Sequence, residues 1–279
     1  MAPKSGSEGR RERGIAIFAV IWLSMLIAAV SVSVTRDTRL TVDIAVNERA
    51  EAQALARAEG ALRWAALVLL AGARGQAPAE TGFAGGAELR VDGTPLIWRF
   101  EGRDVRLSAL AERGKLDLNT ADPWLITGLA ASLASDRSEQ LATAILVARR
   151  RDGQSLAWRI GQRPIDQVAD LARLAPVDHG LYRRLAPLVT VLSGLRAPDL
   201  AVAPEALFRA LPLGEEERAY WRGRRGVAPV PVLRAQAETF TLTAETREGA
   251  EAPPVRLRAL LRLAPAENRP IHLIRLERY

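Results

Sequence analysis

The sequence predicts an α+β protein, in which a long N-terminal transmembrane and amphipathic helix packs on an antiparallel sheet interrupted by a large all-helical insertion. Three observations predict this fold. Positions 15–70 contain no proline and one glycine, short segments of alternating polarity indicate an early and a late set of strands, and residues 116–228 between them have helical patterns. With 279 residues, 48% of them hydrophobic, the chain is long enough to bury a core.

The composition excludes several classes of functional site. The absence of cysteine excludes disulfides, thiolate metal sites and a thiol nucleophile. His179 and His272 lie far apart in the sequence, which argues against a histidine-built metal site. The net charge of +7 comes from 37 arginines and two lysines, a bias more typical of a genome's composition than of a nucleic-acid surface. Because no nucleophile elbow, phosphate loop, zinc-protease helix or dinucleotide fingerprint occurs, we expect no enzyme.

The first helical segment has the length and composition of a membrane span. Ile15–Val34 is twenty residues without a charge, proline or glycine, and such a helix is about 30 Å long, the thickness of a bilayer's hydrocarbon core. Four basic residues outnumber two acidic ones in the leader, residues 1–14, so we expect this leader in the cytoplasm and the rest of the chain exported. A cleaved signal peptide is the alternative, although its apolar region is typically only about 7–15 residues long.

The helix is expected to continue beyond the span over residues 35–72. Good helix formers dominate this segment, and glycines and Pro78 end it. Its apolar residues form one stripe at three-to-four spacing, which predicts that this part packs on another surface. The stripe consists of Leu40, Ile44, Leu55, Ala58, Leu62, Ala65 and Leu69, and it is interrupted by Asn47 and Glu51.

Strand patterns occur in two separate parts of the chain, residues 73–115 and 229–279. Asp-Gly and Glu-Gly dipeptides between the early strands indicate hairpin turns. In the late set, Val255–Leu263 alternates between inward apolar residues and outward arginines, with Leu260 as the exception, so we expect an antiparallel sheet with one solvated face. The expected strands are Ala87–Val91, Leu96–Phe100, Val105–Ser108, Thr239–Thr246, Val255–Leu263 and Ile271–Leu276.

Residues 116–228, between these strand sets, are predicted to be helical and to contain a weak internal repeat. Leu116–Leu129 aligns without gaps to Pro198–Leu211, which indicates two copies of one supersecondary unit. Asn119 or Thr120 is expected to cap the first helix, and Ser138 the second. The opening LDLNTADPWLITGL resembles helix-hairpin-helix modules, but the glycine pair that presents backbone amides to DNA phosphates is absent, so no nucleic acid is expected as a partner.

Three oxygen-bearing side chains near the start of this insertion could serve as calcium ligands. Asp117, Asn119 and Asp122 lie close together in sequence and carry the oxygen ligands that Ca²⁺ prefers. The alternative, that they cap and charge the following helix, is favoured, so we assign no metal residues.

The junction Arg13-Gly14-Ile15 resembles the processing site of type IV prepilins and pseudopilins. This resemblance implies that a prepilin peptidase cuts between Gly14 and Ile15 and that the new N-terminus on Ile15 is methylated. Members of the family usually carry glutamate at the fifth mature position, where this chain has Ala19. The lack of that glutamate is typical of the K-type minor pseudopilin of type II secretion systems.

Leader, early strands, helical insertion and closing strands also occur in the order seen in the K-type minor pseudopilin. The resemblance implies a pilin-like fold and a non-catalytic, single-pass inner-membrane protein that caps a periplasmic pseudopilus with I- and J-type partners, above the major pseudopilin. Some family members bind calcium in the insertion, but none of their ligands can be matched here. A minor pilin of a type IV pilus is the alternative, and a membrane-anchored periplasmic nucleic-acid-binding protein is a more distant one.

Overall fold

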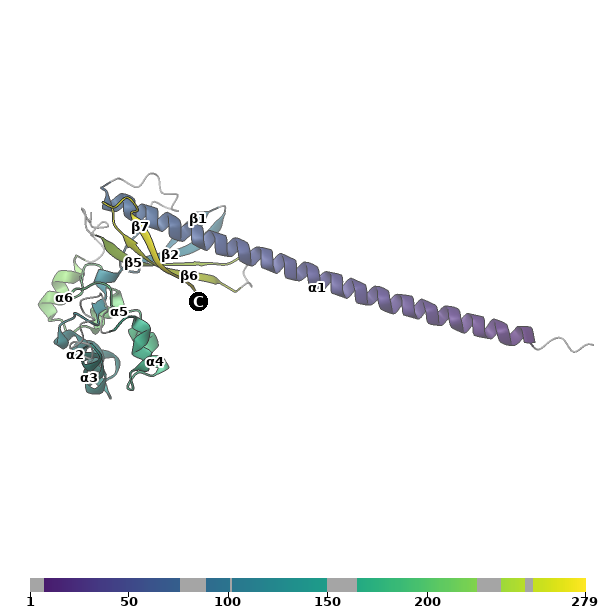
Figure 1. Ribbon diagram of the computed structural model, residues 1–279, viewed down its shortest axis with the longest axis horizontal. Coiled ribbons are helices and arrows are strands. Elements are labelled where there is room, and N and C mark those ends of the chain that lie inside the picture. The colour runs from purple at the N-terminus through teal and green to yellow at the C-terminus, as the bar shows by residue number, and fades with distance from the viewer. Residues whose placement is uncertain (1–7, 76–88, 101, 150–164, 225–236, 249–252) are drawn as a thin grey trace, which may run out of the picture. The chain divides into compact units, whose positions relative to one another are not determined.

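The computed structural model describes residues 8–75, 89–100, 102–149, 165–224, 237–248 and 253–279 (Figure 1). Within the first helix, the side chains of residues 8–17, 32–41 and 43 lie outside this description. The chain divides into two compact units, Met1–Gln53 and Ala54–Tyr279. The fold is α+β with an antiparallel sheet and several helices, as the sequence predicts.

The helix α1 (Glu8–Ala73) runs without interruption through the first unit and into the second. It begins in the predicted leader and ends one residue beyond the predicted boundary. No helix among the described residues is long and apolar enough to span a membrane. Six residues of the predicted span, 15–17 and 32–34, have side chains that the structure does not describe. The membrane span therefore stays a prediction.

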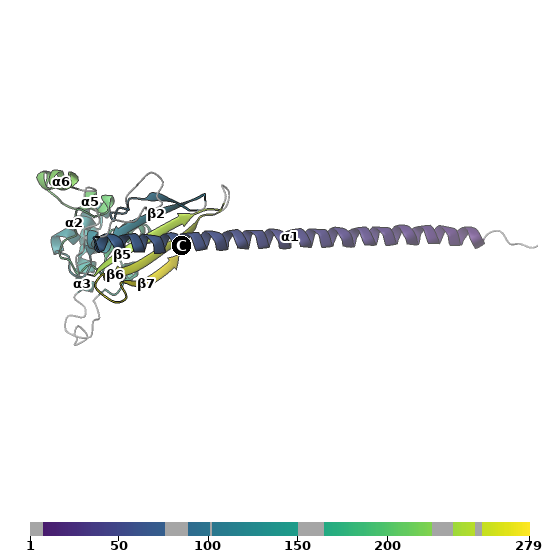
Figure 2. The same cartoon turned by 90° about the horizontal axis from the view of Figure 1, so that it is seen from above.

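The second unit contains a five-stranded sheet covered on one face by the C-terminal part of α1 (Figure 2). All neighbouring strands are antiparallel, and the sheet order is β1-β2-β5-β6-β7. Ala58, Leu62, Ala65 and Leu69 of the predicted stripe are buried against it, Leu55 is half-buried, and Ile44 in the first unit is exposed. The strands are β1 (Leu96–Phe100), β2 (Arg103–Ala111), β5 (Glu238–Thr246), β6 (Val255–Leu263) and β7 (Ile271–Arg278).

One expected strand, Ala87–Val91, is not a strand where it is described. Residues 87 and 88 lie outside the described part, and Leu89 and Val91 are buried in irregular backbone. A single bridge joins Asp92 to Leu110 of β2, and the Asp92 side chain then accepts a hydrogen bond from Thr94 N–H. This Asx turn interrupts the pairing with β2, which resumes at Leu96 of β1 on the same strand, so Asp92-Gly93 does not close a hairpin. The predicted hairpin at Gly102, which has φ +73°, does join β1 and β2.

The sheet has one buried and one solvated face, as the alternation in β6 predicts. Arg258 is exposed and Arg256 and Arg262 are half-buried, while the residues between them are buried except Leu260. The pairing of β6 with β7 shifts register between Leu260 and Leu261. Leu260, the one apolar residue at an outward position of β6, therefore lies directly beside this bulge.

The insertion between β2 and β5 is mainly helical, but it is not all-helical as predicted. It also contains two short strands, β3 (Leu116–Asp117) and β4 (Val189–Thr190), that pair in parallel. Leu118 N–H extends this pairing by donating to Thr190 C=O. The helices are η2 (Glu112–Gly114), α2 (Pro123–Leu133), α3 (Ser138–Ala148), η4 (Val168–Arg173), α4 (His179–Leu185), α5 (Glu205–Ala210) and α6 (Glu215–Arg222).

Two of the predicted helix caps are wrong. The N-cap of α2 is Asp122, with Pro123 as the first helical residue, and no side chain caps this helix. Ser138 is the first residue of α3, and Arg137 occupies its N-cap. Asn119 does not reach α2 because its side-chain amide exchanges two hydrogen bonds with the backbone of Ile165.

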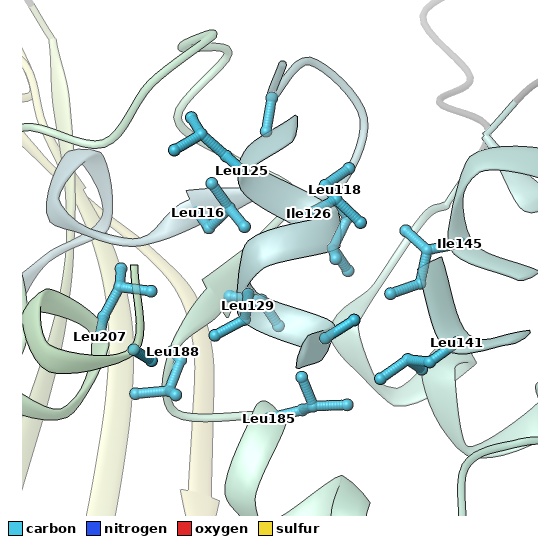
Figure 3. Packing of buried hydrophobic residues seen from close by; sticks show 14 of the residues in the cluster. Leu116, Leu118, Leu125, Ile126, Leu129, Leu141, Ile145, Leu185, Leu188 and Leu207 are labelled. Carbon is cyan, nitrogen blue, oxygen red and sulfur yellow. The ribbon is translucent and has the colours of Figure 1, made fainter. Parts of the chain in front are cut away.

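The aligned copies of the internal repeat also correspond in the structure. The helices α2 and α5 begin at Pro123 and Glu205, which are aligned positions. Asp117 and Asp199, also aligned, each accept a hydrogen bond from the backbone N–H two residues later. The matched apolar positions are all buried, and Leu125, Leu129 and Leu207 belong to one core cluster of the insertion (Figure 3).

Candidate functional site

The predicted processing site lies within α1. Gly14 and Ile15 belong to this helix, but their side-chain environment lies outside the described residues. Ala19 is exposed. Cleavage between Gly14 and Ile15 therefore stays a prediction.

The first unit exposes a continuous apolar surface around Ala19. All described side chains between residues 18 and 31 are exposed, and most of them are large and apolar. An uncovered apolar surface of this kind indicates a partner, either lipid or protein. Its large members are Phe18, Val20, Ile21, Trp22, Leu23, Met25, Leu26, Ile27 and Val30.

In the second unit, the solvent-facing side of α1 offers a further apolar contact. Leu67 is 58% exposed, although Leu62 and Leu69 on the other side are buried. A Cβ added at Gly60 would meet no atom within 4 Å. Among the described residues, nothing covers this face of α1, which can contact a neighbouring protein.

The sheet exposes apolar residues at its edge strand β7. No described strand pairs with the outer side of β7. Leu273 and Leu276 lie opposite Leu261 and Ala259, which are buried, so all four belong to the face on which α1 packs. Leu273 and Leu276 are nevertheless exposed, together with Ile274 at the bulge. An open strand edge with exposed apolar side chains is a template for contact with another chain.

A partly buried ionic cluster joins the insertion to the sheet. The Arg113 guanidinium lies between two carboxylates, with Nε 2.9 Å from Asp199 Oδ2 and Nη1 2.6 Å from Glu238 Oε1. The pKa of Glu238 is raised to about 7, mainly by burial and also by the charge of Asp199, against the opposing effect of Arg113. The second oxygen of Glu238 is buried and has no hydrogen-bond partner among the described residues. Burial therefore favours the protonated form of Glu238, while the ion pair with Arg113 favours the charged form.

Next to this cluster, a second buried ion pair holds the start of the insertion. Lys115 Nζ lies 2.6 Å from Glu112 Oε1, which also accepts a hydrogen bond from Thr241 Oγ1 of β5 at 2.6 Å. Gly114 between them packs so closely that an added Cβ would lie 2.4 Å from Val202 O. The insertion therefore packs on the sheet through the close backbone contact of Gly114 and the ion pair between Lys115 and Glu112.

The three candidate calcium ligands, Asp117, Asn119 and Asp122, each form hydrogen bonds or an ion pair with different partners. Both oxygens of Asp117 accept hydrogen bonds, from the backbone N–H groups of Asn119 and Thr120 and from Gly194 N–H and Ser193 Oγ. Asp122 pairs with Arg196 at 2.8 Å, and Asn119 with the Ile165 backbone. Among the residues that the structure describes, no three His, Cys, Asp or Glu side chains are placed to hold a metal.

Sequence reasoning missed the charged residues at the junction. Arg113 and Glu238 are separated by 125 positions, and neither belongs to a motif. The repeat offered one signal, because Asp199 is the counterpart of Asp117 and both organise the turn before a helix.

No protein-family model matches the chain, and no curated sequence matches it significantly. Among solved structures, one similar chain belongs to the crystal structure of the GspK-GspI-GspJ complex from the enterotoxigenic Escherichia coli type 2 secretion system. The alignment covers 83% of this chain and 98% of that chain, with 13% identity and a TM-score of 0.48.

Proposed function

We propose that the chain is a non-catalytic minor pseudopilin of a type II secretion system. It caps the tip of the periplasmic pseudopilus and helps to initiate its assembly for export of folded proteins across the outer membrane. The observation that carries this proposal is the junction Arg13-Gly14-Ile15, which is followed directly by an apolar stretch of one helix, α1, whose C-terminal part packs on an antiparallel sheet.

The proposed location is the inner membrane, with residues 15–34 as a single span, the leader in the cytoplasm and the rest in the periplasm. The uncharged twenty-residue stretch supports this, as do the exposed apolar side chains between residues 18 and 31. A prepilin peptidase removes residues 1–14 on the cytoplasmic side, and the new N-terminus is methylated.

The proposed partners are I- and J-type minor pseudopilins at the tip and the major pseudopilin below them, with no role for nucleic acid. Resemblance of the sequence to the K-type subunit is the basis of this assignment. The exposed side of α1 around Leu67 and the open edge of β7 provide surfaces on which such subunits can pack.

The position at the tip is argued from Ala19. Cleavage leaves an amine on Ile15, and an amine or a carboxylate is costly in hydrocarbon unless the two are paired. A subunit added later needs a glutamate to engage the amine of the one before it. The first subunit has nothing before it, so a glutamate there would be a lone buried charge, which Ala19 avoids.

N-terminal sequencing of the mature protein tests the class, and labelling of assembled filaments tests the position. We expect the mature chain to start at Ile15 and immunogold label to occur once per overproduced pseudopilus, at the end distal to the membrane. An intact Met1, or a start after residue 30, contradicts the class. Regular label along the shaft contradicts the tip position, as does a clear gain of secretion on Ala19→Glu.

A minor pilin of a type IV pilus is the closest alternative. The large insertion between β2 and β5 favours the K-type pseudopilin, since an insertion of this size is typical of that subunit. Deletion of the gene separates the two, because the pseudopilin predicts a loss of protein secretion and the pilin a loss of surface pili.

A further inference from the structure

An open depression of about 480 Å³ lies where the β1–β2 hairpin meets the C-terminal end of β5. Charged side chains from β1, β2 and the end of β5 line it. Four are arginines and two are carboxylates, so the positive charges exceed the negative ones. They are Arg99, Arg103, Arg106, Arg247, Asp104 and Glu245.

Both carboxylates are already engaged by arginines other than Arg106 and Arg247. Asp104 Oδ1 lies 2.8 Å from Arg99 Nε, and this hydrogen bond holds the pKa of the Asp104 carboxyl below its ordinary value. Glu245 Oε2 lies 3.2 Å from Arg256 Nε on the far side of β5. The excess positive charge therefore resides on the remaining arginines.

Arg106 and Arg247 have no carboxylate partner among the described residues. Arg106 lies directly opposite Glu245 in the ladder, yet Glu245 pairs with Arg256 instead. Arg103 is only loosely paired, since its Nη2 lies 4.0 Å from a Glu248 oxygen while Glu248 also pairs with Arg57. Unpaired guanidinium groups in a hollow are placed to form charge-assisted, bidentate hydrogen bonds with carboxylates.

The depression also has an apolar element. Ile97 lies opposite Arg106 on the neighbouring strand and is 43% exposed. The methylene groups of a glutamate or aspartate side chain can pack on Ile97 while the carboxylate reaches Arg106.

We propose that this depression binds an acidic segment of a partner polypeptide, with Arg106 and Arg247 engaging separate carboxylates and Ile97 contacting the stems. Glutamate and aspartate side chains suit the site better than inorganic phosphate, because phosphate has no methylene group to pack on Ile97. The proposal goes beyond the pseudopilin function, because binding of an acidic segment does not require filament assembly.

The test uses the full chain in non-ionic detergent and a fluorescent oligoglutamate peptide, with binding followed by anisotropy at about 50 mM salt. We expect Arg106→Gln with Arg247→Gln to weaken binding at least about tenfold. The matched control is Arg183→Gln with Arg184→Gln, which removes the same charge from exposed positions on α4. The control is expected to bind within about twofold of the unmodified protein.

Hydrogen exchange on the unmodified protein gives a second measurement that needs no variant. Peptide binding should protect amides near Ile97 and Arg106 and leave α4 unchanged. Equal weakening by both double variants, protection elsewhere, or no peptide binding would overturn the proposal. Displacement of the peptide by equimolar inorganic phosphate, or tighter binding to anionic phosphatidylglycerol vesicles, would also overturn it and would assign the site to phosphate groups.

Discussion

Arg113 and Glu238 connect the two ends of the insertion where it meets the sheet. Arg113 lies two residues after the end of β2, Glu238 is the first residue of β5, and their side chains lie 2.6 Å apart. Asp199 from within the insertion binds the same guanidinium. The Arg113 side chain thus connects the segment after β2, the first residue of β5 and the insertion. These ion pairs hold the insertion against the sheet.

Stability should depend on pH through Glu238. Its pKa is raised from 4.5 to about 7 by burial, so the folded state holds a proton that the unfolded state releases. This contribution is fully present below about pH 4.5 and is lost as the pH rises through about 7, and its size is on the order of 3 kcal/mol. Urea unfolding of the wild type and Glu238→Gln between these pH values measures it. The glutamine variant should lack this part of the pH dependence, and parallel curves for the two proteins would refute the assignment.

A charge on the buried side of α1 should destabilise the second unit. Leu62 is 5% exposed, so Leu62→Asp buries an unpaired carboxylate, which costs several kcal/mol or forces protonation. Leu67→Asp, at a position 58% exposed on the same helix, is the matched control and should change stability by less than about 1 kcal/mol. Thermal melting of a chain that starts near Thr35 measures both. An unchanged melting temperature for Leu62→Asp would mean that α1 does not pack on the sheet.

Two glycine-to-alanine substitutions should have opposite effects. Gly114→Ala places a Cβ 2.4 Å from Val202 O, against backbone that cannot move aside, so we expect a loss of about 2 kcal/mol. Gly60→Ala meets no atom within 4 Å and should stabilise the helix by about 1 kcal/mol. Denaturant midpoints measure the two changes. Equal effects of both substitutions would contradict the close approach at the junction.

Processing should require a small residue at position 14. A small side chain lets an intramembrane protease approach the backbone, so Gly14→Leu should leave an uncut precursor about fourteen residues longer than the mature protein. Immunoblotting of membranes, with Gly60→Ala as a processed control, shows the difference. Normal processing of the leucine variant would exclude this cleavage site.

The sequence predicted those elements whose patterns are local. Helix α1, the alternation in β6 and the hairpin at Gly102 each follow from neighbouring residues, since periodicity and turn chemistry act over a few positions. The cap of α2 was predicted at Asn119 or Thr120 and is Asp122, because Asn119 finds a tertiary partner in Ile165. A prediction from local sequence cannot include a hydrogen-bond partner that is 46 positions away and competes for the capping side chain.

By itself, the sequence determined the long helix, the two strand sets, the insertion between them and the repeat, because each is encoded in local spacing of apolar residues. Only the tertiary structure decided that β2 pairs with β5 across the whole insertion and that Arg113 reaches Glu238. It also decided that β3 and β4 form a parallel pair inside a helical segment. These contacts join residues that are distant in sequence, and their energy depends on burial and mutual pairing that exist only after the chain has folded.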